Sequence, residues 1–172
     1  MDISTERPAS SRFSTALAGF QAGMVGGLWM LTWMGSSSVW QGRSFWTPEN
    51  LLATVFYGGR ALRQGFSGST LSGLAVYLIV YSILGSSLAA TVRLKLPPLH
   101  LVLASIALAV AWYYLSFHLI WKVLSPLVPL LHAARPTLFG HVIYGAMVAR
   151  FPRYVPQAVA EPAPESLLTP GD

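Results

Sequence analysis

Two histidines are the residues with the clearest capacity for chemistry, because His118 and His141 both lie inside apolar runs. Counted from expected helix ends near Leu124 and Arg135, each lies about six residues in, roughly 9 Å along a helix axis. We therefore expect both imidazoles at one depth on antiparallel neighbouring helices. There they could ligate a haem iron between them, or each could hold the magnesium of a chlorophyll or bacteriochlorophyll.

A purely structural role for the two histidines is the alternative. At helical spacings of four and three residues, His118 would bond Tyr114 and His141 would bond Tyr144, or each would bond a backbone carbonyl. Neither histidine belongs to a recognised local metal motif. We therefore expect no required cofactor, and a haem or chlorophyll contact only as an added role.

Acidic residues and cysteines are scarce, which argues against an enzyme. No Asp or Glu occurs between Glu49 and Glu161, and the chain contains no cysteine. Proton relays, cation sites and acid–base catalysis in membranes depend on carboxylates. A serine–histidine–aspartate site, a thiolate metal site and a phosphate-binding glycine loop after a strand are all missing from the sequence. The chain is therefore expected to be non-enzymatic.

The composition is that of a membrane protein. Of 172 residues, 53% are hydrophobic and only 10% are charged, whereas soluble domains carry about 25% charged residues. The mean hydropathy is +0.54. The net charge of +5 comes from Arg and Lys scattered in ones and twos, a pattern typical of contact with anionic lipid headgroups and not of nucleic-acid binding.

Apolar runs of spanning length define the elements that carry these residues. A helix needs about 20 mainly apolar residues to cross the hydrocarbon core. We predict an all-α polytopic membrane bundle with four transmembrane helices, over about 13–39, 68–92, 99–124 and 136–150. The fourth is short, and a re-entrant segment is its alternative. A soluble segment, 1–12, precedes this 13–150 domain, and a proline-rich tail, 151–172, follows it.

The stretch between the first two spans is predicted to be an amphipathic interfacial helix over about 48–63. Pro48 fits a first helical position, and Glu49 lies in the first turn, where the helix dipole favours an anion. Trp46 is expected as an interfacial anchor, and Arg60 and Arg63 as cations at the other end. Leu51, Leu52, Val55, Phe56 and Leu62 gather on one side, and Glu49, Asn50, Thr54, Tyr57 and Arg60 largely on the other. A gating or partner-docking role is the alternative to a plain surface helix.

Small residues in the first span predict close helix packing. Gly19, Gly23 and Gly27 recur every four residues, beside a parallel row of Ala18, Ala22 and Gly26. Such ridges let another backbone approach closely, which matters in lipid because apolar burial alone does not drive helices together. The partner is either a helix of the same chain or another subunit.

The location follows from the distribution of Lys and Arg on the two sides of the spans. The side with both termini has a small excess, which favours cytoplasmic termini. We expect a multi-pass protein of the bacterial inner membrane, in contact with membrane lipids.

The order of motifs resembles a loose group of small, uncharacterised four-span bacterial integral membrane proteins. The motifs that carry the resemblance are SFWTPEN (44–50), GFSG (65–68) and HVIYGAMVA (141–149), and it extends over most of residues 15–150. It implies four spans, including the short last one. It implies no activity.

These features together predict a structural accessory subunit of a larger energy-transducing complex, photosynthetic or respiratory, with other integral membrane subunits as partners. Mid-span tyrosines favour this, because a phenol in hydrocarbon needs a hydrogen-bond partner. The rival is a small homo-oligomeric transporter or channel for a neutral or anionic solute, with Gln21, Tyr113 and the histidines along its path.

Overall fold

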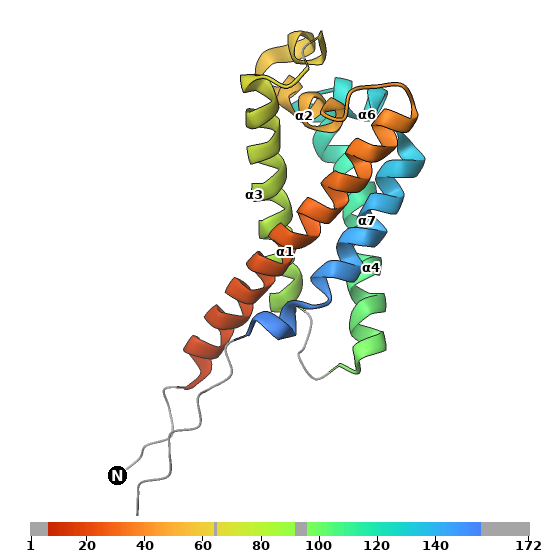
Figure 1. The fold of residues 1–172 in the computed structure, drawn as a ribbon. Coiled ribbons are helices and arrows are strands. Elements are labelled where there is room, and N and C mark those ends of the chain that lie inside the picture. Colours follow the sequence, from red (N-terminus) through yellow and green to blue (C-terminus); the bar gives the residue numbers. More distant parts are fainter. Residues whose placement is uncertain (1–6, 64, 92–95, 156–172) are drawn as a thin grey trace, which may run out of the picture.

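The computed structural model describes residues 7–63, 65–91 and 96–155, and every regular element in these ranges is helical, as the sequence predicts (Figure 1). The α-helices are α1 (Arg7–Trp40), α2 (Thr47–Tyr57), α3 (Gly68–Thr91), α4 (Pro98–Leu115), α5 (Trp121–Leu124), α6 (Leu127–Leu131) and α7 (Ala134–Val148). Two 3-10 turns, η1 (Gly58–Arg63) and η3 (Phe151–Tyr154), and a π-helical turn, η2 (Ser116–Ile120), complete the element order.

Two helical segments are long and apolar enough to cross a membrane. They are α3, with 24 residues, and the 27-residue segment Pro98–Leu124 formed by α4, η2 and α5. Both expose large apolar side chains on their outer faces: Leu71, Ile79, Ile83, Leu103, Leu108, Leu115 and Leu119. The protein is therefore all-helical, with two candidate membrane helices.

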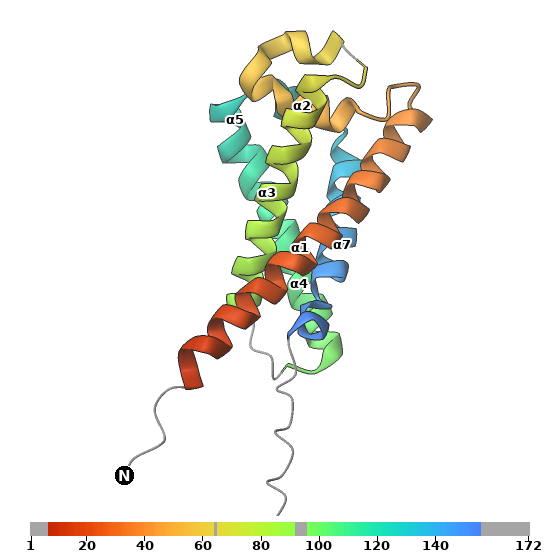
Figure 2. The same cartoon turned by 60° about the vertical axis from the view of Figure 1, so that its left-hand side comes forward.

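Helix α1 crosses the other long helices diagonally (Figures 1 and 2). It begins at Arg7, so the segment expected to be soluble up to residue 12 is helical from residue 7. At the other end of the chain, Phe151 is fully buried in η3. The expected proline-rich tail therefore begins with a packed turn, and residues 156–172 lie outside the described part of the chain.

The crossing of α1 with α3 depends on glycines. A Cβ added at Gly85 of α3 would lie 2.5 Å from the carbonyl oxygen of Gly19 and 2.6 Å from the Cα of Gly23. Neither distance leaves room for a side-chain atom. The two backbones therefore touch directly, and the first glycine row serves a contact within the chain.

The parallel row packs against a different region of the same bundle. Ala18 and Ala22 are buried, and a Cβ at Gly26 would lie 3.1 Å from the ring of Tyr144 on α7. Gly27, the last member of the first row, faces Tyr81 and Tyr77 of α3. Helix α1 thus joins α3 and α7 through small residues.

The stretch predicted as one interfacial helix is divided, and its expected sidedness holds for Leu51, Tyr57 and Arg60 but not for four other residues. The α-helix ends at Tyr57 and a 3-10 turn continues to Arg63, because Gly58 adopts a φ of +57°. Glu49, Asn50 and Thr54, expected on the outer side, are buried, whereas Phe56 is exposed. Figure 2 shows α2 across one end of the bundle.

We expect Gly85→Ala to destabilise the protein, because its Cβ would force α1 and α3 apart. Overpacking of this kind costs about 1–3 kcal/mol. Gly68→Ala is the matched control, since Gly68 lies in the same helix with no atom within 4 Å of an added Cβ. Thermal unfolding in detergent checks both variants. Equal melting temperatures for the two would contradict the tight crossing.

Candidate functional site: a cavity beneath helix α2

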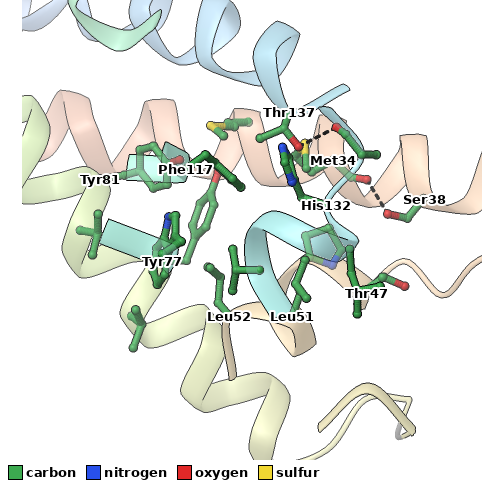
Figure 3. A pocket seen from close by; sticks show the side chains of 18 of the residues that line it. Met34, Ser38, Thr47, Leu51, Leu52, Tyr77, Tyr81, Phe117, His132 and Thr137 are labelled. Atoms are coloured by element: carbon green, nitrogen blue, oxygen red, sulfur yellow. Dashed lines mark hydrogen bonds between the residues drawn. The ribbon is translucent and has the colours of Figure 1, made fainter. Parts of the chain in front are cut away.

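A cavity of about 60 Å³ lies beneath α2, among α1, α3, the α4–α5 segment and the α6–α7 connection (Figure 3). Most of its wall is apolar. Its polar and aromatic lining residues include Arg43, Tyr77, Tyr81, Trp112, His132 and Thr137. This volume has room for a few water molecules, because one water needs about 10–15 Å³ of such space.

The cavity has a mouth toward solvent at the α2 end of the bundle. A second recess, outside the first, shares four lining residues with it: Arg43, Thr47, Leu51 and Leu131. Arg43 is exposed there. The mouth thus carries a positive charge, which favours neutral or anionic molecules over cations.

A buried hydrogen-bond network forms the deep end of the site. The Tyr81 hydroxyl donates to Nε2 of His141 at 2.9 Å, because Nδ1–H of His141 already donates to the Thr137 carbonyl at 2.8 Å. The Tyr144 hydroxyl donates to the Tyr81 carbonyl at 2.6 Å. His141 is fully buried and both its ring nitrogens are used. The network ties α3 to α7.

A second tyrosine–histidine pair lies nearer the mouth. The Tyr113 hydroxyl and Nε2 of His132 are 3.3 Å apart, and Nδ1–H of His132 donates to the Pro129 carbonyl at 2.8 Å. Burial lowers the pKa of His132, although the carbonyls of Pro129 and Val128 partly offset this. The neutral ring can accept the tyrosine proton at Nε2.

The structure does not bring the two predicted histidine ligands together. His118 is exposed on η2, where its Nδ1–H donates to the Tyr114 carbonyl at 3.0 Å, as the structural alternative expects. His141 is buried and bonds Tyr81 and Thr137, not Tyr144. A single haem held between His118 and His141 does not fit this arrangement. Among the described residues, no group of three or more His, Asp or Glu could hold a metal ion.

Glu49 is the unexpected member of the site. It is the only carboxylate in the described part of the chain, and it is 1% exposed at the contact of α2 with α3. Neither carboxyl oxygen has a hydrogen-bond partner within the structure. Burial raises the pKa of Glu49 to about 7, and its own backbone N–H only partly offsets this. The nearby Tyr77 hydroxyl is also buried and unpartnered.

Other polar residues of α2 are well bonded and fix the helix in place. Nδ2 of Asn50 donates to the Gly65 carbonyl at 3.1 Å, and Thr70 donates to Oδ1 of Asn50 at 2.7 Å. The hydroxyls of Thr54 and Ser125 are 2.7 Å apart. The SFWTPEN and GFSG motifs are therefore in direct contact.

The remaining predicted residues lie outside the cavity. Arg60 and Arg63 are exposed on η1, and Trp46 is half-buried against the ring of Phe66, with centroids 4.9 Å apart. Gln21 is exposed on the outside of α1, so it does not line the path proposed for a transported solute. Among the histidines, only His132 lies in the cavity wall.

Sequence reasoning missed Glu49, Tyr77 and Tyr81. One signal was available, because Glu49 is the single acidic residue between Glu6 and Glu161. Its position in the first turn of a helix was explained by the favourable interaction of an anion with the helix dipole. Tyr81 had no local signal, since its partner His141 is 60 residues away. Tyr77 had none either, because its hydroxyl has no partner.

The fold and the cavity define the class as an all-helical protein with two candidate membrane helices and a small internal cavity. Comparison of the chain with protein-family models, with curated proteins and with solved structures gives no match. Function is therefore argued from the geometry of the described residues.

We expect the stability of the protein to fall as the pH rises through Glu49 ionisation. The folded pKa is about 7 and the ordinary value is 4.5, so between them only the folded chain keeps the proton. The free energy of unfolding decreases across this window by about 3 kcal/mol in full. Below pH 4.5 Glu49 contributes no pH dependence.

Thermal unfolding of the wild type and Glu49→Gln between pH 4 and pH 9 measures this effect. The variant should lose the decline and exceed the wild type at pH 8. Glu161→Gln makes the same change of charge in the tail and should keep the wild-type decline. An identical decline in Glu49→Gln would show that ionisation of Glu49 does not cause it.

Tyr81→Phe should destabilise the protein more than Tyr57→Phe. The first leaves Nε2 of buried His141 without a donor, at a cost of about 1–3 kcal/mol. The second removes an exposed bond to Ser72 of 3.1 Å, where water replaces the partner. Chemical unfolding in detergent compares the two. Equal losses would argue against the buried network.

Proposed function

We propose that the chain is a four-span protein of the bacterial inner membrane, with both termini cytoplasmic, and a non-enzymatic accessory subunit of a larger energy-transducing complex. The lengths of α1 and α7 support the count of four spans. Helix α1 has 34 residues and α7 has 15, which correspond to about 51 Å and 22 Å. Both expose large apolar side chains, among them Leu28, Trp29 and Phe139. The described chain also begins and ends at the same end of the bundle (Figure 1).

The observation that carries the subunit proposal is a pair of polar rings on the outer surface of the α4–α5 segment. Tyr114 is 51% exposed and His118, one turn later, is also exposed, among exposed Leu115 and Leu119. The π-helical turn at Ser116–Ile120 carries His118. Such turns occur frequently at functional sites.

Lipid tails provide no hydrogen-bond partner for the Tyr114 hydroxyl or for Nε2 of His118. Hydrocarbon offers no hydrogen-bond partner, and an unsatisfied polar group there costs several kcal/mol. Another integral membrane subunit that supplies polar atoms would remove this cost. We therefore assign the partner to the face formed by Tyr114, Leu115, His118 and Leu119, hereafter the outer polar face.

The same geometry selects His118 over His141 for a cofactor contact. Nε2 of His118 has no partner among the described residues and lies on the surface, so it could ligate a haem iron or chlorophyll magnesium at a subunit boundary. His141 would first have to release Tyr81. A pigment or haem at His118 would also account for an energy-transducing host.

Photo-crosslinking from positions 115 and 119 in native membranes tests the subunit proposal. We expect a discrete cross-link to one integral membrane chain that also co-purifies in stoichiometric amount. The double variant Tyr114→Phe, His118→Leu should abolish the complex without unfolding the protein, because both side chains are exposed. Crosslinkers at Ile79 and Ile83, exposed on α3, should capture lipid only.

A protein that runs alone or as a homo-oligomer in mild detergent, with no cross-link from the outer polar face, would contradict the proposal. The absorption spectrum of the intact assembly tests the cofactor contact separately. His118→Leu should remove a pigment or haem band that His141→Leu retains.

The second candidate is a transporter or channel for a small neutral or anionic solute. The cavity and its Arg43 mouth favour it. Against it, Gln21 faces outward and the Tyr81–His141–Tyr144 network closes the deep end. Solute uptake into proteoliposomes that Arg43→Gln reduces, by a protein purified without partners, would favour this candidate over the first.

A further inference from the structure

Glu49 and Tyr77 are two buried polar residues that the accessory role does not use. Their exposed fractions are 1% and 5%. Both carboxyl oxygens and the phenol oxygen lack a hydrogen-bond partner, whereas most buried side-chain polar atoms in proteins have one. An unpaired buried carboxylate is the more costly of the two groups, since burial penalises the charged form.

Among the described residues, no cation stabilises the anion of Glu49, whose pKa responds to burial and to its own backbone N–H. Arg43, which precedes α2, is exposed at the cavity mouth. Tyr77 is the titratable side chain of α3 that interacts with it. Helix α1 has no charged side chain after Arg12. On η1, Arg60 and Arg63 are exposed, and burial lowers the pKa of His132, which follows α6. The neutral carboxyl is thus the form that this site accepts.

We propose that Glu49 is a proton-binding site that controls the docking of α2: its carboxyl is neutral while α2 packs on α3, and loss of the proton loosens α2. Protonation removes the charge that burial penalises. A pKa of about 7 lets both forms occur near neutral pH.

The backbone contact at this point makes the docking sensitive to the charge of Glu49. A Cβ at Gly73 of α3 would meet the Glu49 carbonyl and lie 3.2 Å from the Ala53 nitrogen. Glu49 is 1% exposed, so full solvation of its anion requires α2 to move away from α3. Because Pro48, Leu51 and Leu52 of α2 line the cavity, such a separation also widens the cavity. The ligand is a proton, and its release opens the site.

This proposal does not rest on the accessory role or on the number of spans. It concerns the docking of one helix within the chain. A failure of the subunit experiments therefore leaves it unchanged, and its own failure leaves the outer polar face unaffected.

Infrared spectroscopy of the full-length protein in detergent tests proton binding directly. Between pH 5 and pH 9 the wild type should lose the C=O band of one buried protonated carboxyl, with a midpoint near neutral pH. Glu49→Gln should lack this band. A wild type with no such band, or a band retained in Glu49→Gln, overturns the assignment.

Thiol labelling tests the docking of α2. Because the chain contains no cysteine, only the introduced thiol is labelled. Ser125→Cys places a near-isosteric thiol at a buried position in contact with Thr54 of α2. We expect its labelling rate to rise at least tenfold from pH 5.5 to pH 8.5, after correction for the thiolate fraction measured with an exposed Ser44→Cys control. Adding Glu49→Gln should abolish this rise.

The matched buried control is Ser105→Cys on α4, which lies against α7 and away from α2. Its corrected labelling rate should not change with pH. A corrected rate for Ser125→Cys that is also flat, or that rises equally in the Glu49→Gln background, overturns the control of docking by Glu49.

Discussion

The direct backbone contact of α1 with α3 is the constraint on which the other packing depends. Gly19, Gly23 and Gly85 leave no space for a side chain at the crossing. Small residues continue along the neighbouring face of α1, where Gly26 packs against Tyr144 of α7. A helix that touches two others at van der Waals distance fixes their separation. The position of the cavity and of the polar network follows from that separation.

Several hydrogen-bonded polar side chains lie in the interior of this bundle. The Tyr81–His141 bond, the Tyr144 hydroxyl and the Tyr113–His132 pair all lie inside, whereas large apolar side chains cover the outer faces of the long helices. This distribution suits a low-dielectric environment, where polar groups must find partners within the protein. The bonds of Tyr81 to His141 and of Tyr144 to the Tyr81 carbonyl join residues distant in the chain, so they also specify that α3 and α7 are neighbours.

Helix α2 shows how the two motifs noted in the sequence work together physically. Asn50 of SFWTPEN bonds Gly65 of GFSG, and Trp46 packs on Phe66. These contacts hold the first turns of α2 against the bundle and carry Glu49 inward with them. The carboxyl therefore enters an apolar contact because its neighbours on the helix are held there, although it has no partner of its own. The contacts of its neighbours thus hold Glu49 in a buried position that penalises its charged form. The stability of this arrangement therefore depends on whether Glu49 is protonated.

The sequence by itself determined the helical class, the positions of the long helices to within a few residues and the small-residue rows of α1, because these depend on local composition and periodicity. The sequence also shows that acidic residues are rare between the two ends of the chain. The burial of Glu49, the one acidic residue in that region, is therefore notable. The tertiary structure decided the rest: which side of α2 faces inward, that His118 lies outside while His141 bonds Tyr81, and that Glu49 is buried. Periodicity assigns residues to a side of a helix but does not say what covers that side. Hydrogen bonds between residues 60 or more positions apart decide that, and nothing local encodes them.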